Sequence, residues 1–175
     1  MDVVVVGAGP TGLMLAGELA LGGVSVEVVE REPVPSGQSR GGGVNQRTAE
    51  VLAMRGLLAA VLGRAVPRTS SGGHFAGLPV PLDVTPWRTR HPDGIVVPQD
   101  RLEEILQARV REQGVEVRRG AGLTGLVQDA DGVTAELAGG ARVRSRFLVA
   151  CDGGHSTVRR LVGADFPGKV ARWPR

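Results

Sequence analysis

The feature that most constrains this sequence is a glycine-rich loop between an apolar strand and an apolar helix. The segment "VVVVGAGPTG", residues 3–12, opens with a β-branched run that is typical of a strand covered on both faces in a parallel sheet. Apolar residues then recur at helical spacing up to Leu21, and Gly22-Gly23 ends the helix. A second β-branched strand, residues 24–29, closes on Glu30. This pattern predicts a βαβ unit.

The glycines of the loop suit a bound dinucleotide, each for a different reason. Gly7 allows the tight turn, Gly9 lets the backbone approach a pyrophosphate, and Gly12 permits close packing of the helix on the strand. The helix N-terminus adds unpaired N–H groups and a partial positive charge. Glu30 lies 18 residues after Gly12, where a carboxylate can accept hydrogen bonds from an adenosine ribose. A glycine-rich turn without a ligand is the alternative, and the combination of strand, helix and carboxylate disfavours it.

The middle of the chain alternates loops with helices. Residues 31–44 are rich in Gly, Pro and Ser, which predicts a long loop. Asn45 is placed to cap a helix that runs to about Leu62 and is interrupted at Gly56. Residues 67–98 predict short strands and turns. Another helix follows, for which Asp100 and Glu103 form a predicted capping box and Gly114 a stop.

The last third of the chain predicts strands without helices between them. Residues 115–118 form one strand, and residues 123–128 and 133–137 flank "DADG", a hairpin turn signal. Further strands lead to Cys151, so an antiparallel meander replaces the crossover helices with which an NAD(P)-dependent dehydrogenase builds its sheet. The predicted fold class is α/β. With the long loop after Glu30, this architecture resembles the Rossmann-like FAD-binding domain of the glutathione-reductase type, and a dehydrogenase is the disfavoured alternative.

Composition limits the remaining function classes. The chain has 175 residues, of which 42% are hydrophobic, enough for one core. The net charge is +3, aromatic residues make up 3% and Tyr is absent, so we expect no nucleic-acid binding. The apolar runs fall far short of the roughly 20 residues of a membrane span, and we see no signal peptide. Cys151 is the single cysteine, which agrees with a cytoplasmic location.

Several segments resemble flavoprotein aromatic hydroxylases, the class A monooxygenases related to para-hydroxybenzoate hydroxylase, and most closely the bacterial polyketide hydroxylases that act on angucycline- and anthracycline-like rings. These segments are "VVVVGAGPTGLMLAGELALGGVSVEVVER", "SRGGGVNQRTAEVL", "GGHFAGLPV", "VPQDRLEEIL" and "CDGGHSTVRR" followed by "GADFPG". The resemblance covers residues 2–168, and its Asp-Gly segment is the most selective part. It implies FAD as cofactor, NAD(P)H as electron donor, O2 as the source of the hydroxyl group and an aromatic polyketide-like substrate.

The same resemblance implies which residues hold FAD. It assigns the pyrophosphate to Gly7, Gly9 and Gly12 and the adenosine end to Glu30 and Arg31. Because the cofactor carries the hard chemistry in such enzymes, we expect no catalytic side-chain constellation and no metal site.

Four further residues complete the implied site. Arg40 resembles an arginine that reaches the phosphate and sugar of the flavin, and Gln99 a glutamine on the ribityl side. Leu123 resembles a residue whose backbone meets the adenine, and Asp152 the aspartate that serves both FAD and NAD(P)H. A solvated loop position for Arg40 and a place just before a helix cap for Gln99 are the alternatives.

The resemblance also implies a division of the chain. Residues 1–69 and 98–168 are predicted to be two segments of the FAD-binding domain, 70–97 an excursion toward the substrate-binding region, and 169–175 a tail unlike the family. Hydroxylases of this kind continue into a substrate-binding sheet and a Gly-Asp motif, and this sequence has no Gly-Asp dipeptide. We therefore expect the FAD-binding portion of a monooxygenase, impaired or inactive as the isolated chain. The alternative is a non-catalytic FAD- or adenine-nucleotide-binding module or partner subunit.

Overall fold

A computed structural model describes residues 1–35, 37, 41–67, 90–91 and 94–168 of the chain. It divides into two compact units, one made of Met1–Val34 with Val110–Arg175 and the other of Pro35–Arg109. Most of the predicted excursion at 70–97 and the predicted tail at 169–175 lie outside the described residues, so the division derived from the sequence stays a prediction.

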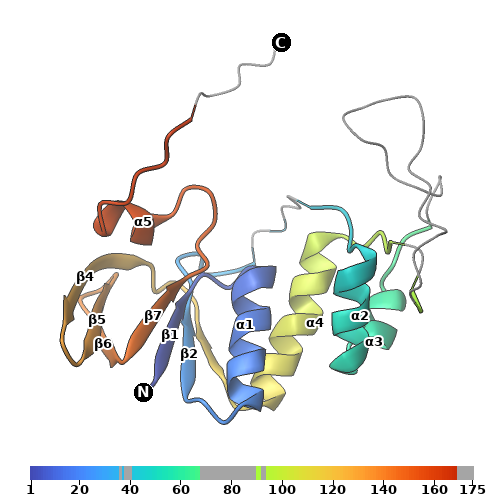
Figure 1. The fold of residues 1–175 in the computed structure, drawn as a ribbon, viewed down its shortest axis with the longest axis horizontal. Coiled ribbons are helices and arrows are strands. Elements are labelled where there is room, and N and C mark those ends of the chain that lie inside the picture. The colour runs from blue at the N-terminus through green and yellow to red at the C-terminus, as the bar shows by residue number, and fades with distance from the viewer. Residues whose placement is uncertain (36, 38–40, 68–89, 92–93, 169–175) are drawn as a thin grey trace. The chain divides into compact units, whose positions relative to one another are not determined.

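The first unit is built on a parallel sheet whose strands are ordered β3-β2-β1-β7 (Figure 1). The strands are β1 (Val3–Val6), β2 (Val26–Val29), β3 (Glu116–Arg118) and β7 (Phe147–Ala150), and helix α1 (Pro10–Leu21) connects β1 to β2. The whole of β1 is buried, as its unbroken valine run predicts for a central parallel strand. The βαβ unit predicted from the sequence is confirmed.

Local sequence explains both ends of α1. Gly9 is the N-cap residue with extended backbone, and Pro10 occupies the first turn, where its missing N–H costs nothing. At the other end Gly22 is the C-cap residue and Gly23 adopts a positive φ of 77°, which glycine tolerates best. Leu13 and Ala16 are fully buried on the face of α1 that covers the sheet. The glycine loop is thus held between two well-defined elements.

An antiparallel sheet of three strands covers the other face of the parallel sheet. Its strands are β4 (Leu123–Asp129), β5 (Gly132–Leu137) and β6 (Arg142–Ser145), paired in that order. The Asp129 carboxylate accepts hydrogen bonds from the N–H groups of Asp131 and Gly132, at 2.9 and 3.1 Å, and so shapes the predicted "DADG" hairpin turn. The predicted meander in place of crossover helices is confirmed.

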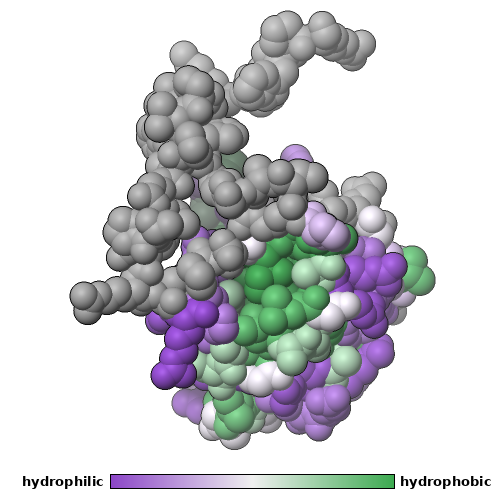
Figure 2. Space-filling model, turned by 90° about the vertical axis from the view of Figure 1, so that its right-hand side faces the viewer, coloured by the Kyte–Doolittle hydropathy of each residue, from purple (hydrophilic) through white to green (hydrophobic). Residues whose placement is uncertain are grey.

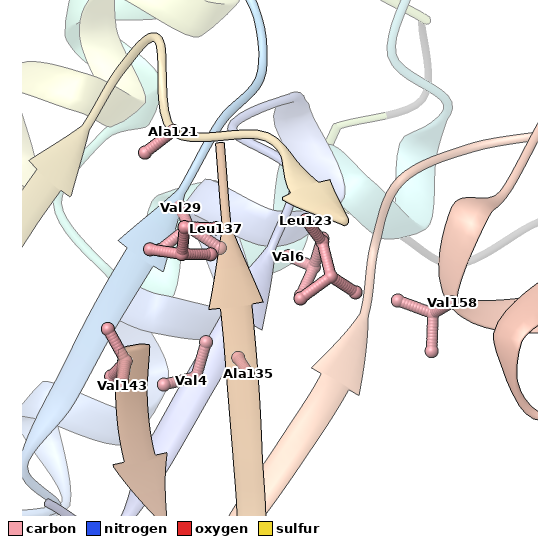
Figure 3. Close-up of a cluster of buried hydrophobic side chains, with 9 residues drawn as sticks. All are labelled: Val4, Val6, Val29, Ala121, Leu123, Ala135, Leu137, Val143 and Val158. Atoms are coloured by element: carbon pink, nitrogen blue, oxygen red, sulfur yellow. The ribbon is translucent and has the colours of Figure 1, made fainter. Parts of the chain in front are cut away.

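The two sheets meet in one apolar cluster (Figure 3). Alternate residues of the parallel sheet, Val4, Val6 and Val29, face the meander, as the side-chain period of two requires. They pack against side chains from the β3–β4 connection, the meander and helix α5 (Thr157–Leu161), namely Ala121, Leu123, Ala135, Leu137, Val143 and Val158. Through the packing of Val6 and Val29 against Leu123, the cluster holds the carboxyl ends of β1 and β2 beside the start of β4.

Strand β7 is only partly buried although its sequence is apolar. It pairs with β1 and lies at the edge of the sheet formed by the described residues, and the side chain of Phe147 is 59% exposed. An edge strand has a neighbour on one side only, so an apolar sequence does not guarantee burial there. Its carboxyl end still reaches the same sheet edge as those of β1 and β2, because all three strands are parallel.

The second unit is mainly helical. It contains α2 (Gln46–Met54), α3 (Leu58–Leu62) and most of α4 (Gln99–Glu112). Asn45 caps α2 by accepting a hydrogen bond from the Thr48 N–H at 2.8 Å, as predicted, and Gly56 separates α2 from α3 with a φ of 70°. Val44 and Ile95 form an isolated antiparallel bridge.

The predicted capping box of α4 is wrong. The helix begins at Gln99, so Asp100 lies inside its first turn rather than at the cap position. The carbonyl of Pro98 instead accepts the N–H groups of Arg101 and Leu102, at 3.1 and 3.2 Å. An acidic residue in the first turn still interacts favourably with the positive end of the helix dipole, which explains why the sequence signal looks like a cap.

Apolar side chains gather on the face of the second unit that carries α2 and α3 (Figure 2). Met54, Leu62 and Val66 are among the exposed large hydrophobic residues of the chain, with exposed fractions of 61%, 53% and 43%. Among the described residues no helix is both long and apolar enough to cross a membrane.

Candidate functional site

The glycine loop closes on the end of β7. Gly7 has a φ of 106°, and its N–H donates to the carbonyl of Val29 at 2.8 Å. A Cβ at Gly7 would lie 2.5 Å from the carbonyl oxygen of Cys151. Two separate features therefore exclude a side chain at position 7: the positive φ and the close approach of the Cys151 carbonyl. Position 7 must be glycine for β1 and β7 to end side by side.

The other two loop glycines have opposite surroundings. A Cβ at Gly12 would collide with the carbonyl oxygen of Gly7 and lie 3.2 Å from the Cβ of Cys151. Nothing among the described residues lies within 4 Å of a Cβ placed at Gly9. Gly12 thus serves close packing of α1 on the loop, whereas Gly9 borders open space at the N-terminus of α1. This open space is where an anion meets the free N–H groups of a helix N-terminus.

Glu30 ties the end of β2 to the glycine loop. One carboxylate oxygen accepts the Ala8 N–H at 2.7 Å, and the other accepts the Glu32 N–H at 2.9 Å. Each oxygen has further acceptor capacity, so the carboxylate can also receive hydroxyl groups. The hydrogen bond from Ala8 could not be read from the sequence, because it joins residues 22 positions apart.

Arg31 and Leu123 are brought together by the connection between β3 and β4. The Glu30 N–H donates to the carbonyl of Arg118 at 2.9 Å, and the Ala121 N–H donates to the carbonyl of Glu30 at 2.8 Å. Arg31 itself is exposed, with its Nε 3.1 Å from a carboxylate oxygen of Glu32. The side chain of Leu123 is buried in the core, and its main chain pairs with that of Leu137 in β5.

Asp152 follows β7 and anchors the short helix α5. Its Oδ2 accepts the N–H groups of Thr157 and Val158, at 2.6 and 3.1 Å, and the Ser156 hydroxyl accepts the Arg159 N–H at 3.0 Å. The other oxygen, Oδ1, is buried without a hydrogen-bond partner among the described residues. Burial raises the pKa of Asp152, but hydrogen bonds from Ser156, Val158 and Thr157 outweigh it and leave the pKa below its ordinary value. The carboxylate is therefore ionised at neutral pH.

Cys151 has a structural place in this turn. Burial, with a smaller contribution from the Asp152 charge, raises the pKa of its thiol, so the thiol stays protonated at neutral pH. Its Cβ packs toward Gly12. Cys151 is thus a half-buried residue that packs like a small apolar side chain.

Two predicted site residues lie outside the described part of the first unit. Gln99 belongs to the second unit, where its side-chain amide donates to the Glu103 carboxylate at 2.7 Å. Arg40 lies outside the described residues. Their predicted roles at the flavin end therefore stay predictions. The remaining seven residues, Gly7, Gly9, Gly12, Glu30, Arg31, Leu123 and Asp152, all belong to the first unit.

The residues present fit a dinucleotide such as FAD. Open space beside Gly9 meets a helix N-terminus, which suits a pyrophosphate. The carboxylate oxygens of Glu30 can accept hydrogen bonds from ribose hydroxyls. Oδ1 of Asp152 has no donor among the described residues, and a sugar hydroxyl can supply one. All three features lie where β1, β2 and β7 end, the edge at which open α/β sheets bind ligands. No group of His, Cys, Asp and Glu in the described part of the chain could hold a metal ion.

Sheet order, meander and glycine loop together define a dinucleotide-binding domain of the glutathione-reductase type. Comparison with known families agrees: the FAD binding domain family matches residues 1–174, and the chain belongs to this family. The predicted fold class and the prediction of FAD as cofactor are thereby confirmed.

Several of the relatives are monooxygenases or hydroxylases. The chain is 50% identical to a rifampicin monooxygenase of Streptomyces venezuelae over 98% of its own length and 36% of the relative. It is 52% identical to a 12-dehydrotetracycline 5-monooxygenase/anhydrotetracycline 6-monooxygenase of Streptomyces rimosus over 96% of this chain and 34% of the relative.

A solved structure is similar throughout. The anhydrotetracycline hydroxylase OxyS of Streptomyces rimosus superposes with a TM-score of 0.90 at 50% identity, covering 97% of this chain and 35% of that one. The predicted resemblance to polyketide hydroxylases is confirmed, and the chain spans about a third of the length of these relatives.

Proposed function

We propose that the chain is the FAD-binding part of a monooxygenase that hydroxylates an aromatic polyketide with NAD(P)H and O2. The observation that carries this proposal is the convergence of the glycine loop, Glu30 and Asp152 at one sheet edge in a member of the FAD binding domain family. Similarity to tetracycline and rifampicin monooxygenases supports a large aromatic substrate.

The binding roles follow from the chemistry of each group. The pyrophosphate lies against the glycine loop and the N-terminus of α1, where N–H groups and the helix dipole neutralise its charge. Glu30 accepts the ribose hydroxyls while its hydrogen bond from Ala8 keeps it against the loop. Asp152, fixed by two N–H groups of α5, accepts a hydroxyl of the flavin side chain. Arg31 and the Leu123 backbone flank the adenine.

The bound flavin supplies the electron transfer and the activation of oxygen that no side chain can perform. The contribution of this chain is orientation. Asp152 is ionised and already hydrogen-bonded before the cofactor arrives, so binding requires little reorganisation of this side chain. Neither Gln99 nor Arg40 is needed for this part of the proposal.

A flavin titration of the purified 175-residue chain tests the proposal. We expect FAD to bind with quenching or enhancement of its fluorescence and a shifted visible absorbance spectrum, saturating at micromolar concentration. Absence of bound flavin at that concentration would contradict the binding role. ADP should compete with FAD, since it carries the adenosine and pyrophosphate that the described residues are proposed to hold.

A second measurement separates the monooxygenase from its alternative. If the FAD-loaded chain oxidises NAD(P)H with consumption of O2, it is catalytically competent for the reductive half of the reaction. That result would count against the non-catalytic FAD- or adenine-nucleotide-binding module or partner subunit, whereas tight FAD binding without NAD(P)H oxidation agrees with both readings.

A further inference from the structure

The β3–β4 connection runs alongside the residues that follow β2. The N–H groups of Ala121 and Gly120 donate to the carbonyls of Glu30 and Glu32, at 2.8 and 3.4 Å. Gly122 comes next, directly before Leu123, and its carbonyl accepts the Ala138 N–H at 2.8 Å. The main chain around Gly122 is therefore held from two sides, by the residues after β2 and by the end of β5.

Gly122 is in contact with Arg31 through rigid atoms. A Cβ at position 122 would lie 2.9 Å from the Cβ of Arg31 and 3.4 Å from its Cα. A change of side-chain rotamer moves neither of these two atoms. A methyl group at position 122 would therefore have to displace the main chain at Arg31 or at Gly122 itself.

Backbone conformation does not explain this glycine. Gly120 has a φ of 70°, the left-handed region that favours glycine, but Gly122 is not among the described glycines with positive φ. An L-residue could adopt the backbone conformation of Gly122, so space against Arg31 is the requirement at this position.

We propose that Gly122 is a positioning residue for the adenosine end of the site: its missing side chain sets the spacing between Arg31 and the Leu123 backbone. The inference rests on the proposed FAD-binding function, because these two positions are the ones proposed to flank the adenine. Gly122 touches neither the pyrophosphate loop nor Asp152 among the contacts of the described residues, so its influence is confined to one end of the cofactor.

Gly125, three residues further on in β4, provides a matched control. A Cβ at Gly125 would lie 2.7 Å from Oε2 of Glu136, the far end of a flexible and partly exposed side chain. Glu136 can rotate away, so Gly125→Ala needs no main-chain movement. Both variants place an alanine in or next to β4, but only Gly122→Ala presses on rigid atoms.

The experiment compares FAD, ADP and inorganic pyrophosphate as ligands of the parent chain, Gly122→Ala and Gly125→Ala. We expect Gly122→Ala to weaken FAD and ADP about tenfold, and to leave competition by pyrophosphate unchanged. Gly125→Ala should match the parent for all three ligands. Equal affinities for FAD in Gly122→Ala and the parent, or an equal loss for all three ligands, would overturn the inference. Failure of the parent to bind FAD would instead overturn the proposed function.

If Gly122→Ala does not fold, a double variant tests whether contact with Arg31 is the cause. The double variant Arg31→Gly, Gly122→Ala removes the Cβ that the new methyl group would meet. We expect it to fold with a urea midpoint close to that of Arg31→Gly alone. If the double variant also fails to fold while Arg31→Gly folds, contact with Arg31 is not the constraint and the inference is wrong.

Discussion

The two ends of the proposed nucleotide site are held by different kinds of contact, between main-chain atoms at one end and with side chains at the other. At the pyrophosphate end the close contacts are between main-chain atoms: Gly7 faces the Cys151 carbonyl and Gly12 faces the Gly7 carbonyl. At the adenosine end the Glu30 carboxylate holds two N–H groups, and Gly122 faces the Cα and Cβ of Arg31. Main-chain contacts cannot be relieved by a rotamer change, whereas carboxylate contacts can be replaced or lost one at a time.

This difference predicts which substitutions unfold the chain and which only weaken FAD binding. The pyrophosphate end is shared with the core packing of α1 on β1 and β2 and with the close approach of the glycine loop to Cys151, so changes there act on folding first. At the adenosine end the hydrogen bonds of the Glu30 carboxylate lie outside this packing, so loss of that carboxylate acts on the ligand with a smaller effect on stability.

The largest effect is expected for Gly12→Ala. The new methyl group meets the Gly7 carbonyl and cannot rotate away, so we expect a loss of about 3 kcal/mol in unfolding free energy. Urea unfolding followed by circular dichroism measures it. Gly9→Ala is the control: it has open space, should cost no more than about 1 kcal/mol, and should nevertheless abolish FAD binding. A stable Gly12→Ala would break the distinction between the two ends.

The second effect is expected for Asp152. Asp152→Ala leaves the N–H groups of Thr157 and Val158 without their acceptor, which should cost about 2 kcal/mol of unfolding free energy and weaken FAD binding. Asp152→Asn keeps one oxygen and should cost less.

The charge of Asp152 also gives a pH dependence. Because its pKa is lower in the folded chain than its ordinary value of 3.8, ionised Asp152 stabilises the fold above that pH. The stability difference between the parent and Asp152→Asn should be constant near neutral pH and shrink as the pH falls below 3.8 toward the folded pKa. A difference that persists unchanged into strong acid would contradict this assignment.

A smaller effect is expected at the adenosine end for Glu30→Ala. The Ala8 N–H loses its acceptor, which should cost about 1 kcal/mol of unfolding free energy. FAD affinity should fall more than this, since the ribose acceptor is lost as well, and calorimetric titration of the folded variant measures it. Glu30→Gln, which keeps one carbonyl oxygen, should retain most of the stability. A Glu30→Ala variant that unfolds would show that both ends carry the fold equally.

The smallest effect is expected for Glu27→Gln, on β2 below the adenosine end. Glu27 is buried beside Arg118, with 3.0 Å between carboxylate and guanidinium. Burial raises the pKa of Glu27, and the Arg118 charge opposes it only in part. A raised acid pKa favours the folded chain below the ordinary value of 4.5 and disfavours it above the folded pKa. Glu27→Gln should therefore gain stability relative to the parent as the pH rises from acid to neutral, measured by urea unfolding.

Local patterns predicted most of the elements. The valine run, the glycine loop, the Asn45 cap and the "DADG" turn are each decided by neighbouring residues, so their structures follow from spacing alone. Local pattern is also why Asp100 was predicted as the cap of α4. The spacing of Asp100 and Glu103 does not determine at which residue the helix begins. Of the proposed binding positions, Gly7, Glu30 and Asp152 follow the ends of β1, β2 and β7. Gly9 caps α1 and Gly12 lies in its first turn, and the binding roles of all five stay predictions.

By itself the sequence determined the βαβ unit, the meander and the family, because these depend on side-chain periodicity and on glycines at fixed places. Only the tertiary structure decided that β7 lies beside β1 at the edge of the sheet that the described residues form, that Glu30 reaches Ala8, and that Gly122 faces Arg31. These contacts join residues far apart in the chain. Their distances depend on how the strands are ordered in the sheet, and no local pattern encodes that order.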